Sequence, residues 1–210
     1  MIIAVDGPTA SGKGTVAKLL AEHYGLKRLD TGSLYRAVGL LVVDAGGDPS
    51  NVDAAVDAAQ TLDLGAIDEH RIRSSAAGLA ASKVAAIPEV REVLRRAQIA
   101  FAADPKGAVL DGRDIGTVIC PNAEVKLFVT ASLDERTRRR LAELVARGEQ
   151  ITFEELRAQI AERDERDISR KDSPLYQAAD AHLLDTTALS VGEAARAAYA
   201  IVDRTLALRG

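Results

Sequence analysis

The sequence lacks the residue sets on which several classes of protein depend. It has one cysteine, Cys120, in 210 residues, which excludes an intrachain disulfide and a cysteine-based metal site and favours a buried, unreactive thiol. The three histidines, His23, His70 and His182, are scattered without pairing, so none of them is assigned a catalytic or metal-binding role. The chemistry of this protein has to come from other residues.

Long apolar runs and an excess of positive charge are also missing. The formal net charge of −4 gives no basic field for nucleic acid or an anionic membrane. No apolar run approaches the length of a membrane span, and the N-terminal MIIAVDG enters a strand pattern without a basic stretch and cleavage site. We therefore expect a cytoplasmic protein, by default a monomer, whose partners are small molecules and not nucleic acid or membrane.

Short apolar runs alternate along the chain with longer helical patterns. With 47% hydrophobic residues, 210 residues suffice for one well-buried domain. The clearest helix is Lys13–Tyr24, which Gly25 can terminate. The expected strands are Ile2–Asp6, Leu26–Asp30, Ala108–Asp111, Glu124–Thr130 and Ala181–Asp185. This alternation predicts an α/β fold with parallel strands, right-handed crossovers and helices on both faces.

Capping boxes mark the starts of three later helices. In this motif a serine or threonine lies three residues before a glutamate, and each side chain bonds the other residue's backbone N–H. The three pairs are Ser132 with Glu135, Thr152 with Glu155, and Ser190 with Glu193.

The strongest chemical signal is a glycine-rich run directly after the first expected strand. It comprises Gly7, Pro8, Thr9, Ala10, Ser11, Gly12, Lys13, Gly14 and Thr15. A loop without bulky side chains can wrap its N–H groups around a triphosphate, and the following helix N-terminus adds partial positive charge. We expect Lys13 to reach the β- and γ-phosphates of ATP and Thr15 to hold Mg²⁺ through its hydroxyl or a bound water. An ordinary glycine-rich turn is the alternative, but the lysine and hydroxyl fall where this mechanism needs them.

Two further segments lie where a second ligand can bind. The run Asp30-Thr31-Gly32-Ser33-Leu34-Tyr35-Arg36 follows the second expected strand and starts a helix. The run Asp111-Gly112-Arg113-Asp114 leaves the carboxyl end of another strand, the edge where ligands bind in parallel sheets. Asp111 is placed like the acidic residue that holds Mg²⁺ indirectly in P-loop enzymes, although a turn-forming aspartate remains an alternative.

The motifs together resemble the bacterial cytidylate kinase family over nearly the whole chain. They are GPTASGKGT, LDTGSLYR, LDGRDIGT, ERDERDISR and the late DSPL and LDTTALS segments. The resemblance implies a P-loop NTPase fold with five parallel strands, a substrate-binding arm at about residues 62–104 and a short helical lid at about 132–150. It also implies transfer of the γ-phosphoryl group of ATP to CMP or dCMP, with Mg²⁺. Gly14 fits, because nucleoside monophosphate kinases commonly have the GKGT form.

The resemblance assigns the acceptor site to ten residues in three groups. Those implied to read the cytosine are Ser82, Arg91 and Asp114. Those implied to contact the ribose are Thr31, Arg163 and Asp167. Those implied to clamp the acceptor phosphate are Arg36, Arg113 and Arg170, with Tyr35 packing beside them. Arginine suits the clamp because its planar fork holds a phosphate in a defined orientation.

The helix expected from Ser132 and its continuation form the candidate lid. Their arginines are Arg136, Arg138, Arg139, Arg140 and Arg147. Such a charge run is usually only a solvated helix face. The resemblance places lid arginines at Arg136 and Arg139, where they stabilise charge on the migrating phosphoryl group, and it leaves Arg138 and Arg140 unassigned.

One segment departs from the family pattern. Between Leu62 and Pro88 the chain is shorter than in many bacterial members, and Leu64–Arg73 leaves room for at most a short hairpin. This puts in question how far the acceptor arm closes. Two alternatives stay open: a P-loop kinase for another small acceptor, such as UMP, AMP or shikimate, and a non-catalytic P-loop module that binds ATP.

Overall fold

The computed structural model describes residues 1–63, 67, 68 and 70–209, and it forms two compact units. One unit consists of Met1–Leu29 and Phe101–Gly210, and the other of Asp30–Ala100. Among the residues it describes, no helix is long and apolar enough to cross a membrane.

The first unit is built on a five-stranded parallel sheet with the strand order β2-β3-β1-β4-β5. The strands are β1 (Ile2–Asp6), β2 (Lys27–Asp30), β3 (Ala108–Gly112), β4 (Val125–Thr130) and β5 (His182–Asp185). All five lie where the sequence predicts them, and their bounds differ from the predicted ones by at most one residue. The predicted α/β fold is confirmed. Because the strands are parallel, the segments that follow them leave the sheet at one edge.

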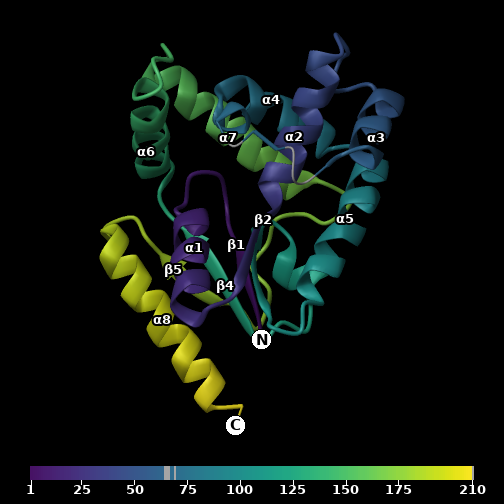
Figure 1. Cartoon of the computed structure of the whole chain (residues 1–210). Helices are drawn as coiled ribbons and strands as arrows, with labels where there is room; N and C mark the ends of the chain where they lie inside the picture. Colours follow the sequence, from purple (N-terminus) through teal and green to yellow (C-terminus); the bar gives the residue numbers. More distant parts are fainter. Residues whose placement is uncertain (64–66, 69, 210) are drawn as a thin grey trace. The chain divides into compact units, whose positions relative to one another are not determined.

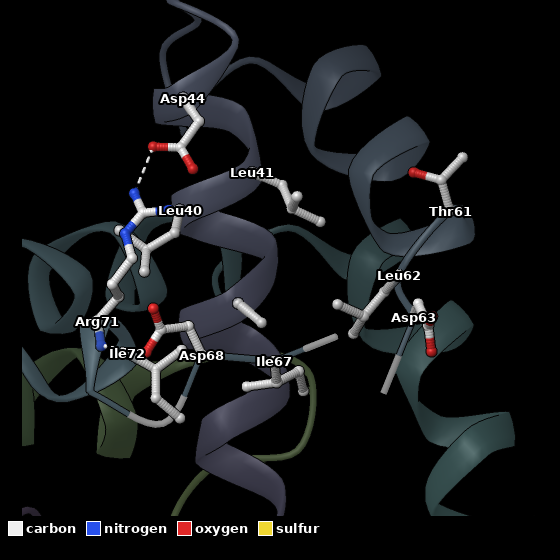
Figure 2. A pocket seen from close by; sticks show the side chains of 11 residues that line it. Leu40, Leu41, Asp44, Thr61, Leu62, Asp63, Ile67, Asp68, Arg71 and Ile72 are labelled. Atoms are coloured by element: carbon white, nitrogen blue, oxygen red, sulfur yellow. Dashed lines mark hydrogen bonds and ion pairs between the residues drawn. The ribbon is translucent and has the colours of Figure 1, made fainter. Parts of the chain in front are cut away.

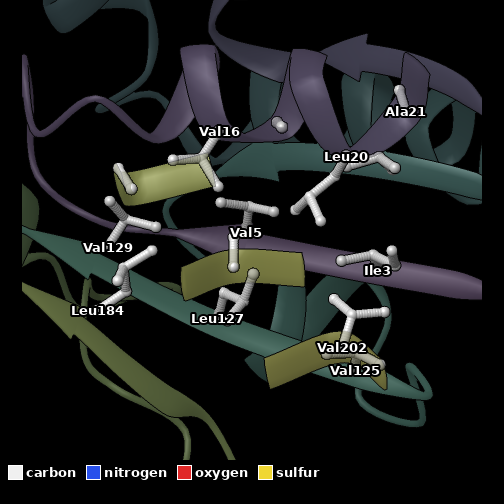
Figure 3. Packing of buried hydrophobic residues seen from close by; sticks show 14 residues of the cluster. Ile3, Val5, Val16, Leu20, Ala21, Val125, Leu127, Val129, Leu184 and Val202 are labelled. Carbon is white, nitrogen blue, oxygen red and sulfur yellow. The ribbon is translucent and has the colours of Figure 1, made fainter. Parts of the chain in front are cut away.

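Alternation along β1 distributes its side chains between two cores. Ile3 and Val5 join the side chains of α1 (Lys13–Tyr24) and α8 (Val191–Ala207) on one face. Figure 3 shows this core, and Figure 1 shows α8 running beside α1. Ala4 faces the opposite core, which includes Ile115 of the π-helix η3 (Ile115–Ile119). Cys120 lies in that second core, where burial raises the pKa of its thiol to about 11.

Helices α6 (Leu133–Val145) and α7 (Phe153–Ser169) pack on each other through a small apolar cluster that includes Leu144 and Ile160. The capping boxes predicted at the starts of α7 and α8 are both present. The capping box predicted at Ser132 has only one of its two hydrogen bonds, so this prediction is half wrong. The Ser132 hydroxyl accepts from the Glu135 N–H, but the Glu135 carboxylate binds Arg138 and Arg139, and the Ser132 N–H donates to Thr187. Two nearby arginines therefore compete successfully for the capping glutamate.

The second unit is helical. It contains α2 (Thr31–Asp44), α3 (Val52–Gln60), the 3₁₀ turn η2 (Arg71–Arg73), α4 (Ser75–Val84) and most of α5 (Pro88–Ala102). Helix α2 packs closely on α4 at Gly39, where an added Cβ would lie 2.7 Å from the Ala80 Cβ. Of the segment for which at most a short hairpin is predicted, residues 64–66 and 69 lie outside the described residues.

Candidate active site

The loop between β1 and α1 has a backbone that requires glycine. At Gly7 the φ angle is 153°, and an added Cβ would lie 2.0 Å from the Val129 carbonyl oxygen. Gly12 caps α1 with a φ of 86°, in the left-handed region that favours glycine. The loop curls so that the Lys13 ammonium donates to the Pro8 carbonyl at 3.2 Å. The residues predicted to form a P-loop therefore make a tight cradle at the N-terminus of α1. A triphosphate can bind at such a place, because the backbone N–H groups of a helix N-terminus attract anions.

The cradle is fastened to the end of β5. The Thr186 hydroxyl donates to the Ser11 carbonyl at 2.8 Å, and the Thr186 N–H donates to the Thr130 carbonyl at 2.8 Å. Ser11 is fully buried, and its hydroxyl has no hydrogen-bond partner in the described part of the chain. Since a buried hydroxyl without a partner is costly, this group supports a polar ligand in the loop.

Asp111, the predicted indirect Mg²⁺ ligand, lies beside the start of α1. An added Cβ on Gly14 would be 3.5 Å from the Asp111 Oδ2 atom, which is an ordinary contact distance and shows that the carboxylate lies next to this residue. Thr15, the other predicted ligand, is exposed on the first turn of the same helix. Among the described residues, no group of three or more His, Cys, Asp or Glu could hold a metal ion. One hydroxyl and one carboxylate fit Mg²⁺ that takes its remaining ligands from phosphates and water.

Sequence reasoning missed the partner of Asp111. Arg28, in β2, donates through Nε to Asp111 Oδ1 at 3.0 Å, and its Nη2 atom lies 2.9 Å from the same oxygen. Asp111 is 3% exposed. The pair joins residues 83 positions apart, so no local pattern announces it.

We expect Arg28→Ala to lower the free energy of unfolding by ~1–3 kcal/mol, because it takes a partner from a buried carboxylate. Urea unfolding followed by circular dichroism measures this change. The matched control is Arg71→Ala, which breaks a pair between Arg71 and Asp44 that is 2.7 Å long but exposed, and which should change stability little. Equal midpoints for wild type and Arg28→Ala would show that the buried pair adds nothing.

Three predicted acceptor residues, Arg113, Arg163 and Arg170, gather around a fourth, Asp167 of α7. Arg113 donates from Nε to Asp167 Oδ2 at 2.8 Å, and Arg170 Nη2 lies 3.6 Å from Asp167 Oδ1. Burial alone would raise the pKa of the Asp167 carboxyl, but Arg113, Arg163 and Arg170 outweigh it and hold this pKa below its ordinary value. The structure therefore brings together residues predicted for the ribose and for the phosphate.

Arg113 also reaches the P-loop. Its Nη2 atom donates to the Thr9 hydroxyl at 2.7 Å. One guanidinium thus connects the segment after β3 with the loop after β1. Asp114, the next residue, is 7% exposed and immediately precedes η3.

The two predicted lid arginines lie at the P-loop. Arg136 is 6% exposed, donates to the Thr9 carbonyl at 3.2 Å and pairs with Asp164 at 2.7 Å. Arg139 donates to the Thr186 hydroxyl at 2.9 Å, and an added Cβ on Gly12 would be 3.5 Å from its Nη1 atom. These positions rule out a merely solvated helix face at both arginines.

Arg138 and Arg140, which the sequence leaves unassigned, pair instead with glutamates on their own helix. Arg138 lies 3.1 Å from Glu135, and Arg140 lies 2.9 Å from Glu143.

The second unit carries the remaining predicted acceptor residues. Asp30 caps α2 by accepting from the Ser33 N–H at 3.2 Å, and its other oxygen accepts from Arg36 at 2.7 Å. Thr31 is buried and Tyr35 half-buried in the first turns of α2.

The predicted cytosine readers Ser82 and Arg91 lie on α4 and α5 of the same unit. Ser82 is half-buried. Arg91 is 7% exposed, which rules out an ordinary exposed basic residue.

A cavity of about 200 Å³ in the second unit does not suit a nucleotide (Figure 2). Its lining contains several leucine and isoleucine side chains and three carboxylates, from Asp44, Asp63 and Asp68. The only cation in the described lining is Arg71, which pairs with Asp44. A lining with more carboxylates than cations repels phosphate, so we do not place either substrate there.

Known proteins similar to this chain include cytidylate kinases. Residues 3–204 match the family model described as cytidylate kinase. The chain is 56% identical over 203 residues to a cytidylate kinase of Xanthobacter autotrophicus, with 97% of both chains covered. It is 52% identical to the cytidylate kinases of Mesorhizobium japonicum and Brucella suis, over 207 and 206 residues. These alignments cover 99% and 98% of this chain, and 96% and 94% of the relatives.

A solved structure gives the fold alone. An uncharacterised protein from Eubacterium ventriosum superposes with a TM-score of 0.57 at 16% identity, covering 97% of this chain and 98% of that one.

Proposed function

Since the chain belongs to the cytidylate kinase family, we infer that it transfers the γ-phosphoryl group of ATP to CMP. The structural observation that carries this conclusion is the glycine-dependent cradle that opens onto the N-terminus of α1 with Lys13 in its first turn. CDP and ADP are the products. We propose dCMP as a second acceptor, as the sequence resemblance implies.

On the donor side, residues 7–15 are proposed to hold the triphosphate of ATP. Lys13, which donates to the Pro8 carbonyl in this structure, is proposed to turn its charge to the β- and γ-phosphates when ATP binds. Thr15 and Asp111 are proposed to hold Mg²⁺, the first directly or through water and the second through water. When bound, the ion neutralises charge on the phosphates and orients them.

On the acceptor side, Arg113 and Arg170 are proposed to clamp the CMP phosphate, and Arg163 and Asp167 to bind the ribose. Three arginines, Arg113, Arg163 and Arg170, around one carboxylate leave net positive charge for a phosphate. The attacking phosphate oxygen is largely dianionic at neutral pH if its second pKa is about 6, so the reaction needs no strong general base.

Residues of the second unit are proposed to complete the acceptor contacts. Arg36 is assigned to the phosphate with Tyr35 packing beside it, Thr31 to the ribose, and Ser82 and Arg91 to the base. Asp114 is likewise assigned to the base. Arg36 is held by Asp30 at the start of α2, which restricts its rotamers before a ligand binds.

Arg136 and Arg139 are proposed to stabilise the charge on the migrating phosphoryl group. Arg136 donates to the Thr9 carbonyl of the P-loop, and Arg139 lies near Gly12. Each is held by an acidic partner, Asp164 for Arg136 and Glu135 for Arg139. Preorganised cations of this kind stabilise a transition state without further reorganisation. We also propose that the segment at about 132–150 acts as a lid that excludes water.

Asp167→Ala should weaken CMP binding, seen as a rise in the KM for CMP, and leave the KM for ATP nearly unchanged. The variant removes a proposed ribose contact and frees guanidiniums that Asp167 now orients. Steady-state kinetics with each substrate varied in turn measures both constants. Glu162→Ala, on the same helix and engaged only with Arg166 at 3.5 Å among the described contacts, is the control and should change neither. An equal rise in both constants would assign Asp167 to the donor site or to the fold.

A single domain at residues 1–210, an arm at about 62–104, a monomeric state and a cytoplasmic location remain proposals.

A further inference from the structure

Asp6, the last residue of β1, is a buried carboxylate that the proposed reaction does not use. It is 6% exposed and directly precedes Gly7, the first residue of the P-loop. Its Oδ1 atom accepts from the Ile115 N–H at 2.8 Å, and its Oδ2 atom accepts from the Gly116 N–H at 2.7 Å. Both donors belong to the first turn of η3.

The turn that Asp6 holds begins at Asp114. The Asp114 carbonyl accepts from the Val118 N–H at 2.8 Å and from the Ile119 N–H at 3.1 Å. The N–H groups of Ile115 and Gly116, the two residues directly after Asp114, donate to Asp6. The backbone on the carboxyl side of Asp114 is therefore hydrogen-bonded at consecutive positions. A π-helix is a rare local structure that appears mostly as a single turn, and such turns are frequent at functional sites.

Close packing leaves this turn little freedom. An added Cβ on Gly116 would lie 3.1 Å from the Lys126 Cδ atom and 3.4 Å from the Asp6 Oδ2 atom. The Lys126 ammonium is itself held by the Pro121 carbonyl at 2.6 Å and by Asp180 at 2.8 Å. The η3 backbone is therefore confined between a fixed lysine side chain and the Asp6 carboxylate.

We propose that Asp6 is a positioning residue for the acceptor base: by fixing the backbone that follows Asp114, it sets where the Asp114 carboxylate meets the cytosine amino group. The inference rests on the proposed role of Asp114 as a reader of cytosine. Asp6 directly precedes Gly7 of the P-loop and accepts hydrogen bonds from the residues that follow Asp114. One residue therefore connects the donor loop with the segment proposed to read the base. Placement matters here, since a displacement of about 1 Å at a substrate contact can cost on the order of 10²-fold in rate.

The ionised form of Asp6 is the one that accepts both hydrogen bonds. Burial raises the pKa of the Asp6 carboxyl to about 7. The N–H groups of Gly116 and Ile115 lower this pKa, Asp114 raises it and Arg113 lowers it. We therefore place the test at pH 8, where the carboxylate form predominates.

The test is Asp6→Asn, which keeps the size of the side chain but turns an NH₂ group toward one of the two backbone N–H donors. We expect the KM for CMP to rise by roughly tenfold, the order of one buried hydrogen bond. The KM for ATP should stay within about twofold. The ratio of kcat/KM for CMP over UMP should fall toward that of Asp114→Ala. The control Asp203→Asn, at a surface carboxylate that accepts from the Tyr24 hydroxyl at 2.7 Å, should change none of these values.

The double variant separates positioning from general support of the fold. If Asp6 acts through Asp114, then Asp6→Asn should lower the CMP over UMP ratio in wild type and should not lower it further in Asp114→Ala. A wild-type ratio in Asp6→Asn, or equal rises in both KM values, overturns the inference while the role of Asp114 stands. An unchanged ratio in Asp114→Ala itself removes the proposed role of Asp114, and the inference about Asp6 falls with it.

If Asp6→Asn fails to fold, Gly116→Ala tests the same contact through the η3 residue that donates to Asp6. Its added methyl group presses on Lys126 and Asp6 without removing a charge. A selective rise in the KM for CMP supports the inference, and an equal rise for ATP overturns it.

Discussion

Lys13→Ala should lower kcat by about 10²–10³-fold or more and leave the fold intact. The reason is the loss of the charge that we propose acts on the transferring phosphoryl group, where a single preorganised donor is worth this much. The Lys13 side chain donates to the Pro8 carbonyl in this structure and does not belong to the apolar cores, so its removal should not unfold the protein. A coupled assay of ADP formation measures the loss, and thermal unfolding checks the fold.

Lys18→Ala provides the matched control. Lys18 is on the same helix, is exposed and lies 3.8 Å from Glu22. Its replacement should leave kcat at the wild-type value. Near-native activity in correctly folded Lys13→Ala would remove the P-loop assignment and with it the donor site.

Asp114→Ala should contract the preference for CMP over UMP by about one to two decades in kcat/KM. Cytosine carries an amino group at position 4, from which a carboxylate can accept a hydrogen bond. Uracil carries a carbonyl oxygen there, so the two acceptors would face each other without a proton. A well-placed contact of this kind supplies on the order of 1–3 kcal/mol of discrimination, at 1.4 kcal/mol per decade.

The two nucleotides therefore have to be compared in wild type and variant under the same conditions. Wild type should strongly prefer CMP, and the variant should lose mainly on CMP. Asp53→Ala, at an exposed carboxylate in the first turn of α3, should keep the wild-type ratio. Proportional losses on CMP and UMP would mean that Asp114 positions Arg113 or its own loop and does not read the base.

The strands, the first helix and the P-loop could be predicted from the sequence because each is specified by residues that are neighbours in the chain. The β-branched run Ile2–Asp6 and the terminating Gly25 fix strand and helix bounds from neighbouring residues alone. The P-loop is equally local, since its glycines, lysine and hydroxyl fall in one stretch of nine residues.

Contacts between distant segments could not be predicted in the same way. The pair of Arg28 with Asp111, and the hydrogen bonds from η3 to Asp6, join residues 83 to 110 positions apart. The half-formed capping box at Ser132 fails for a related reason: the sequence motif is intact, but Arg139 binds the glutamate. Likewise, only the packed structure reveals that Arg91 is buried.

The most direct test of this account is a coupled assay of the purified protein with ATP, Mg²⁺ and a panel of acceptors. The panel comprises CMP, dCMP, UMP, AMP and shikimate, with one reaction lacking an acceptor. We expect CMP to be phosphorylated with a kcat/KM at least about tenfold above that for UMP, by the discrimination expected of one carboxylate contact. Activity on AMP, shikimate and water should be lower still. Turnover of UMP, AMP or shikimate at or above the rate with CMP, or no turnover of any acceptor, would contradict the account.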